Sequence, residues 1–341
     1  MRRFAASSRG SRSFVLLATT ATLCAACGES SEMTATQPLV VGNSPWPGFI
    51  AQFVAEEKGF YAEEGIRVRE KHAWVATDIN EALAAGTVDI AWTGISDVVS
   101  MANEDPSLRL IAVSDYSDGA DGILARGVLE PADLIDKTIA WNDLPLQVLL
   151  LQAYLEGSGI EIDDLDLQTM PPDNAITAYS ARRVDAVITF EPYLSDLLEI
   201  DELRRGEVVF SSRGTNLIAG SLVGKQNTLT DRKEDIEAYI RALEKGYAFY
   251  KQNPEEALAI AANKLQLPVE EIEPIMDNIR LFSPAEHATV LFNPNNPLNV
   301  IDSIEFAAEA GAIAGTASPS VDASSLYDDA YTQGLWQTAT Q

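Results

Sequence analysis

The chain has very few of the side chains that bind metals or form disulfides. Its 341 residues include 2 cysteines, Cys24 and Cys27, and 2 histidines, His72 and His287. Both cysteines lie near the N-terminus, which excludes a disulfide framework or a cysteine-based metal site in the body of the chain. A zinc site needs more nitrogen or sulfur ligands than two distant histidines offer. We therefore expect no metal and no cofactor.

Positive charge is also scarce. The sequence has 24 lysines and arginines against 51 aspartates and glutamates, for a formal net charge of −27. Such a surface repels the phosphates of nucleic acids and the headgroups of anionic lipids. We expect no nucleic-acid partner, and we interpret the acidity mainly as a source of solubility, including in a saline medium.

The N-terminus holds a hydrophobic run that is too short for a transmembrane helix. Four arginines and no acid fall in the first twelve residues, residues 14–23 are mostly apolar, and Ala25 and Ala26 precede Cys27. Residues 1–27 resemble a bacterial lipoprotein signal that is cut before Cys27, whose sulfur then carries a lipid. Residues 28–37 would be a polar tether to the outer side of the cytoplasmic membrane, in the periplasm or at the cell surface. An ordinary secretory signal cut near Ala26 is the alternative.

From residue 38 on, short apolar runs alternate with amphipathic stretches of helical period. The apolar runs predict strands at 39–41, 66–68, 88–91, 110–113, 138–141, 167–170, 185–190 and 208–210, with a return strand at 217–223. Strands separated by helices of about ten or more residues indicate a parallel α/β sheet. After the return strand the pattern is nearly all helical, with a strong helix start at residues 253–256.

Three segments carry a resemblance to a known family. Residues 46–49 read WPGF and are followed by AEEKGFYAEEGI at 55–66. Residues 82–91 read ALAAGTVDIA. Residues 182–187 read RRVDAV and lead into EPY at 191–193. In this order and at this spacing, the segments are similar to those of the solute-binding proteins of nitrate, sulfonate, taurine and thiamine-precursor ABC importers.

The resemblance implies the two-lobed α/β fold of type II periplasmic binding proteins, each lobe a mostly parallel sheet flanked by helices. The first lobe would comprise residues 38–122 and 217–341, and the second residues 123–216. The resemblance also implies a ligand in the cleft between the lobes, partnership with the permease and ATPase of an importer, and no enzymatic activity. We expect the protein to be a monomer.

Ligands of open α/β sheets bind beyond the carboxyl ends of the strands. This rule points to the loops at 44–48, 92–97, 114–118, 141–143 and 190–193. They supply aromatic and polar side chains suited to a small-molecule cleft. The predicted ligand-binding residues are Trp46, Trp92, Thr93, Tyr116, Trp141, Asn142, Asp143, Phe190 and Glu191.

Several of these residues have a purely structural interpretation as well. Trp46 could cover the edge of the sheet, and Trp92 and Trp141 end strands and could belong to the core. Asp143 could cap a helix, and Glu191 could serve merely as the first residue of a helix. These alternatives stay open at the level of the sequence.

The absence of basic residues from the candidate loops predicts the charge of the ligand. They contain several acids and no lysine or arginine. We expect Asp143 to fill the positive end of the following helix, with Pro145 removing a donor, which disfavours an anion. We therefore predict a neutral or cationic nitrogenous ligand, such as a pyrimidine-like thiamine precursor. The alternatives are a sulfonate, nitrate or the zwitterion taurine, because so acidic a chain places acids in any loop.

Two other classes of function compete with solute binding. A precursor-synthesising enzyme shares the fold and depends on a cofactor-linked lysine, but no lysine lies in the candidate loops. A scaffold lipoprotein would have no cleft that closes on a solute.

Overall fold

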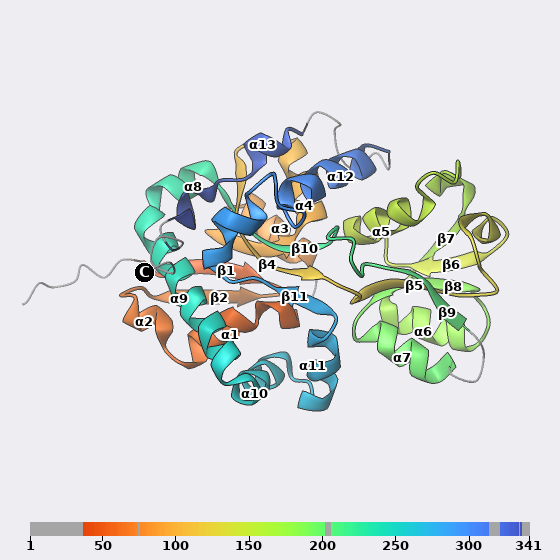
Figure 1. The fold of residues 1–341 in the computed structure, drawn as a ribbon, viewed down its shortest axis with the longest axis horizontal. Helices are drawn as coiled ribbons and strands as arrows, with labels where there is room; N and C mark the ends of the chain where they lie inside the picture. The colour runs from red at the N-terminus through yellow and green to blue at the C-terminus, as the bar shows by residue number, and fades with distance from the viewer. Residues whose placement is uncertain (1–36, 74–75, 202–205, 314–320, 334, 336–341) are drawn as a thin grey trace, which may run out of the picture. The chain divides into compact units, whose positions relative to one another are not determined.

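The computed structural model describes residues 37–341 apart from 74–75, 202–205, 314–320, 334 and 336–341. The predicted signal, Cys27 and the tether up to residue 36 therefore lie outside the described residues. Two β-sheets, each flanked by helices, make up the fold (Figure 1). None of the helices in the described part is long and apolar enough to cross a membrane.

The first sheet draws its strands from both ends of the chain. Its order is β11-β4-β10-β3-β1-β2. Strands β1 to β4 point one way, and β10 and β11 run antiparallel to their neighbours. The strands are β1 (Leu39–Asn43), β2 (Val68–His72), β3 (Ile90–Gly94), β4 (Leu108–Ser117), β10 (Ala219–Lys225) and β11 (Ile279–Leu281).

Buried apolar clusters cover both faces of the first sheet. One cluster joins it to α1 (Ile50–Glu57), α9 (Lys233–Gln252) and α10 (Pro254–Leu265). The other joins it to α4 (Ile95–Glu104) and α12 (Val300–Ile313). The remaining helices of this part are α2 (Phe60–Glu63), α3 (Ala76–Ala84), α8 (Gln226–Asp231), α11 (Val269–Met276) and α13 (Ala323–Leu326).

The second sheet is formed by the middle of the chain. Its order is β7-β6-β8-β5-β9, and β5 runs against the other four strands. The strands are β5 (Asp121–Arg126), β6 (Thr138–Trp141), β7 (Asp166–Thr169), β8 (Ala186–Phe190) and β9 (Gly206–Ser211). The helices α5 (Pro145–Leu155), α6 (Pro172–Ser180) and α7 (Tyr193–Asp201) accompany it.

The chain passes from the first sheet to the second between β4 and β5, and returns between β9 and β10. The second sheet begins at Asp121, two residues before the predicted boundary at 123. The division into a first lobe, 38–122 with 217–341, and a second lobe, 123–216, stays a prediction.

Three predicted strands begin two residues later than expected. The strand expected at 66–68 starts at Val68, the strand expected at 88–91 starts at Ile90, and the return strand expected at 217–223 starts at Ala219. The second shift has a local cause. Gly86 has a φ of 68° and ends α3, while Thr87 N–H donates to the carbonyl of Ala82. The residues just before Ile90 therefore take part in ending the helix and do not pair as a strand.

The start of α10 is confirmed, with Pro254 at its first turn and two glutamates after it. Asn253 precedes the helix without capping it, because its side chain makes no cap hydrogen bond and instead donates to the carbonyl of Phe249.

Candidate ligand-binding site

At the edge of the first sheet where β1, β3 and β4 end, Trp46 is held by a buried carboxyl group. The indole Nε1–H of Trp46 donates to Oδ2 of Asp115 over 3.1 Å, and the hydroxyl of Ser114 donates to Oδ1 over 2.5 Å. A Cβ added to Gly48 or to Gly220 would overlap the same carboxylate. Trp46 itself is half-buried. The backbone at Gly48 and Gly220 therefore packs directly against the carboxylate of Asp115, and this carboxylate orients the indole of Trp46.

Asp115 is almost fully buried, and this burial raises its pKa to about 6 although the bonds from Ser114 and Trp46 lower it. The sequence places Asp115 in a candidate loop, but it does not show that this acid is the partner of Trp46. That pairing joins two segments 69 residues apart.

Three of the predicted binding residues of the first sheet are buried. Trp92 donates its Nε1–H to the hydroxyl of Tyr239 over 2.9 Å. Tyr116 donates to the carbonyl of Leu298 over 3.1 Å, and burial raises its pKa to about 12. These partners assign both rings to the core. For Trp92 this agrees with the structural interpretation, whereas Tyr116 was predicted only as a binding residue. Thr93 is 3% exposed, and its hydroxyl has no hydrogen-bond partner within the part of the chain that the structure describes.

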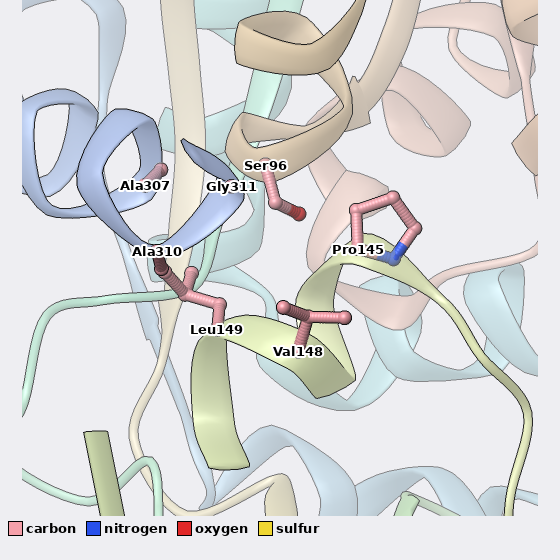
Figure 2. A pocket seen from close by; sticks show the side chains of 7 residues that line it. All are labelled: Ser96, Pro145, Val148, Leu149, Ala307, Ala310 and Gly311. Carbon is pink, nitrogen blue, oxygen red and sulfur yellow. The ribbon is translucent and has the colours of Figure 1, made fainter. Parts of the chain in front are cut away.

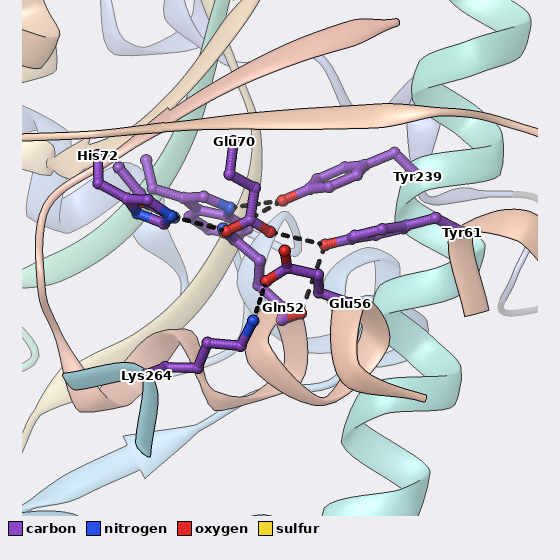
Figure 3. Close-up of polar contacts among 9 residues, drawn as sticks. Gln52, Glu56, Tyr61, Glu70, His72, Tyr239 and Lys264 are labelled. Carbon is purple, nitrogen blue, oxygen red and sulfur yellow. Dashed lines mark hydrogen bonds and ion pairs between the residues drawn. The ribbon is translucent and has the colours of Figure 1, made fainter. Parts of the chain in front are cut away.

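Tyr239, which accepts the hydrogen bond from Trp92, belongs to a network of polar contacts (Figure 3). The hydroxyl of Tyr239 donates to Oε1 of Gln52 over 3.2 Å, and Tyr61 stacks on Tyr239 at 5.5 Å between ring centroids. The hydroxyl of Tyr61 lies 3.4 Å from Glu70, whose pKa burial raises to about 7. The network fixes Trp92 from within the core.

The start of α4 carries its own carboxylate. Asp97 lies in the first turn, and its Oδ1 accepts a hydrogen bond from Nδ2 of Asn80 over 2.9 Å. Burial raises the pKa of Asp97 to about 6. Because a helix N-terminus attracts negative charge, Asp97 occupies a position that an anionic ligand would otherwise use.

The start of α5 differs from the prediction. Asp143 is exposed, has a φ of 59° and does not cap the helix; the N-cap is Leu144, which makes no side-chain cap bond. In this left-handed conformation Asp143 precedes the cap position, and the Asn142 N–H donates to Oε1 of Gln147 over 2.6 Å. The expectation that Asp143 fills the positive end of α5 is therefore wrong.

A small hollow of about 10 Å³ lies between the starts of α4 and α5 (Figure 2). Ser96 from α4 and Pro145 from α5 face each other across it in the figure. Its other lining residues are Val148, Leu149, Ala307, Ala310 and Gly311. Helices α4 and α12 of the first sheet and helix α5 of the second sheet therefore all contribute residues to this hollow.

The ends of β6 and β8 hold the remaining predicted residues. Trp141 is 8% exposed and donates its Nε1–H to Thr169 over 3.2 Å, which places it in the core of the second sheet. Phe190 is half-buried and lies edge-on to Tyr193. Glu191 is buried and accepts bonds from the backbone N–H and the hydroxyl of Ser195. Burial raises the pKa of Glu191.

Asp121, at the start of β5, is a buried acid that the sequence reasoning missed. Its pKa is raised to about 7, mainly by burial and also by the nearby carboxylates of Asp115 and Glu191, although a bond from Ser117 lowers it. An acid two residues before the apolar run at 123–125 was the available signal. It was overlooked because β5 was not predicted as a strand.

Asp97, Asp115 and Glu191 thus lie in the loops that the sequence predicts to bind the ligand, whereas Asp121 lies outside those loops and pairs with Phe190 at the end of β8. None of the ion pairs that join described residues involves these four carboxyl groups. A buried carboxyl group without a cation partner favours its neutral form, and it would be stabilised in its ionised form by a bound cation.

Two curated relatives of the chain are binding proteins. The chain is 23% identical over 272 residues to the formylaminopyrimidine-binding protein of Halalkalibacterium halodurans, covering 74% of this chain and 76% of that protein. It is 20% identical over 275 residues to the taurine-binding periplasmic protein of Escherichia coli, covering 79% and 85%.

The predicted fold class is confirmed by a solved structure. The periplasmic aliphatic sulphonate binding protein SsuA of Escherichia coli superposes with a TM-score of 0.70 at 17% identity, covering 85% of this chain and 97% of that one. The model of the NMT1/THI5-like family matches residues 46–257, which is more than half of the chain. The chain therefore belongs to the NMT1/THI5-like family, within which it is similar to solute-binding proteins.

Proposed function

We propose that the chain is an extracytoplasmic solute-binding protein of an ABC importer, anchored by a lipid on Cys27, and that it captures a small neutral or cationic nitrogenous solute between its lobes. The family and the named relatives support solute binding. The permease and ATPase of the importer are the expected partners, and no catalytic role is proposed.

The observation that carries the choice of ligand is the set of buried carboxyl groups without ion-pair partners. Asp115, Asp121 and Glu191 interact electrostatically through Asp121. An anion near them would meet repulsion in a medium of low dielectric constant. An amine or a ring N–H would instead gain acceptors, and half-buried aromatic rings such as Trp46 and Phe190 could cover the apolar part of the solute.

The rival ligand class is an anion such as a sulfonate. The start of α5 favours it, because Asp143 leaves that helix end free of an acid. The start of α4 opposes it, because Asp97 lies in the first turn. Taurine carries an ammonium and a sulfonate. Its ammonium would fit the acidic region, and its sulfonate would fit the start of α5, which carries no acid in its first turn. The similarity to a taurine-binding protein keeps it as the second candidate.

Thermal unfolding with a panel of solutes tests the proposal. A solute that binds only the folded chain stabilises it and therefore raises its melting temperature. At a solute concentration of a hundred times Kd, the free energy of unfolding rises by about 2.7 kcal/mol. We expect an amine-bearing pyrimidine to raise it, taurine to raise it less, and ethanesulfonate and nitrate to leave it unchanged. If no panel member shifts it at millimolar concentration, the solute-binding proposal is contradicted.

The lipid anchor has its own test. Replacing Cys27 with alanine removes the sulfur that would carry the lipid, so the protein should move from the membrane to the soluble fraction on cell fractionation. Cys24→Ala is the matched control and should stay with the membrane. A Cys27→Ala protein that remains membrane-bound would show that another feature anchors it.

A further inference from the structure

The two chain segments that connect the sheets are tied together by one buried hydroxyl group. The Oγ of Ser212 accepts hydrogen bonds from the backbone N–H groups of Gly119, over 3.0 Å, and of Asp121, over 3.3 Å. It also lies 2.6 Å from Oγ of Ser117. Ser117, Asp121 and Ser212 are each at most 3% exposed. We call these three residues the hinge clasp.

Backbone bonds reinforce the clasp. Ser212 N–H donates to the carbonyl of Asp121 over 2.9 Å, and Ser117 N–H donates to the carbonyl of Ile218 over 2.9 Å. One clasp residue, Asp121, is an acid whose side chain bonds to Ser117. A carboxyl group is therefore built into the connection about which the two lobes would move relative to each other.

The groups facing Asp121 are acidic. Asp115 on β4 and the carboxylate of Glu191 after β8 act on it directly. The cations of this region have other partners: Arg213 lies beside Gly119 and donates to Asn278, and Arg280 lies over the ring of Phe282.

The other nearby acid, Asp118, accepts a hydrogen bond from the N–H of Gly214 over 2.8 Å. Asp121 thus has one hydroxyl partner and no cation among the described residues, which favours a bound proton.

We infer that the hinge clasp links solute capture to a proton: Asp121 is protonated in the ligand-free chain and ionises when a cationic solute is held between the lobes. This rests on the proposed function, since an anionic solute would keep the proton in place. The inference goes beyond the proposed function in one respect: the affinity for the cationic solute decreases as the pH falls. Such a protein takes up its solute best in neutral or alkaline surroundings.

Calorimetry with choline tests the inference, because its quaternary ammonium keeps its charge at every pH. Titrations at pH 6.5 in phosphate and in bis-Tris, two buffers with different ionisation enthalpies, give the number of protons released. We expect release approaching one proton, and an affinity that falls about tenfold per pH unit below 7, as linkage to a single proton requires. Asp121→Asn should abolish both effects. Asp118→Asn, in the same connection, should keep them.

Melting curves supply a readout that needs no solute. The pKa of Asp121 lies above its ordinary value of 3.8, at about 7. Its contribution to stability is therefore complete below pH 3.8 and is lost as the pH rises through 7. The wild-type melting temperature should fall relative to that of Asp121→Asn between pH 5 and 8. Equal trends in the two proteins overturn the inference.

The possible outcomes separate the inference from the proposed function. Choline binding with the same affinity at pH 6 and 8 and no proton release overturns the inference alone. Binding of ethanesulfonate or nitrate with no binding of choline at any pH overturns the proposed ligand class, and the inference with it. Release in the wild type that persists in Asp121→Asn assigns the proton to another group and overturns the inference.

Discussion

Replacing Gly246 with alanine is expected to destabilise the folded chain by about 3 kcal/mol, near the upper end of the usual cost of overpacking. Gly246 lies within α9 where this helix crosses α1. A Cβ at this position would come closer to the carbonyl oxygen of Ala51 than the 3.0 Å that real Cβ atoms keep. The obstacle is backbone, so it cannot move unless α1 shifts. This cost exceeds the gain of about 1 kcal/mol from the better helix propensity of alanine.

Urea unfolding measures this effect as a lowered midpoint at an unchanged slope. Lys251→Ala, on the exposed side of the same helix, is the control and should stay within about 0.5 kcal/mol of the wild type. A Gly246→Ala protein as stable as the wild type would mean that α1 and α9 do not approach as closely as the structure shows.

Replacing Trp46 with alanine is expected to weaken solute binding by about 1–3 kcal/mol, the usual loss for a partly buried aromatic contact. The indole is fixed by Asp115 and packs against the core of the first sheet, so it presents a preorganised surface. Calorimetry with the solute found in the melting panel gives the loss directly.

Trp46→Phe separates the two roles of this residue. The phenyl ring keeps an apolar surface but cannot donate to Asp115, which is then buried without one of its donors. We expect affinity between those of the wild type and Trp46→Ala, together with a small loss of stability. If Trp46→Ala binds the solute as tightly as the wild type, Trp46 only covers the edge of the sheet.

Local patterns in the sequence were sufficient for most of the fold. Strand β6 coincides with the predicted run at 138–141, and β1 begins at the predicted Leu39. The antiparallel strand β11 was not predicted, because three residues between helices leave no period to detect. Strand β5 was missed because its apolar run is short and only residues 118–120 separate it from β4.

The candidate site was less predictable, because its contacts depend on distant segments. The loops were found from the strand ends, but the sequence could not tell a ring that faces a cleft from one that faces the core. Trp92 is held by Tyr239, which is 147 residues away. Asp143 was misplaced because its left-handed backbone, unusual for a residue other than glycine, carries no sequence signal.

Competitive calorimetry with an aminopyrimidine, taurine, ethanesulfonate and nitrate tests the central claim most directly. The account predicts that the aminopyrimidine binds most tightly, and that Glu191→Gln and Asp121→Asn each weaken it, because the carboxyl groups accept its N–H bonds. Tight binding of ethanesulfonate or nitrate, undiminished in both variants, would contradict the claim and identify the chain as an anion-binding member of its family.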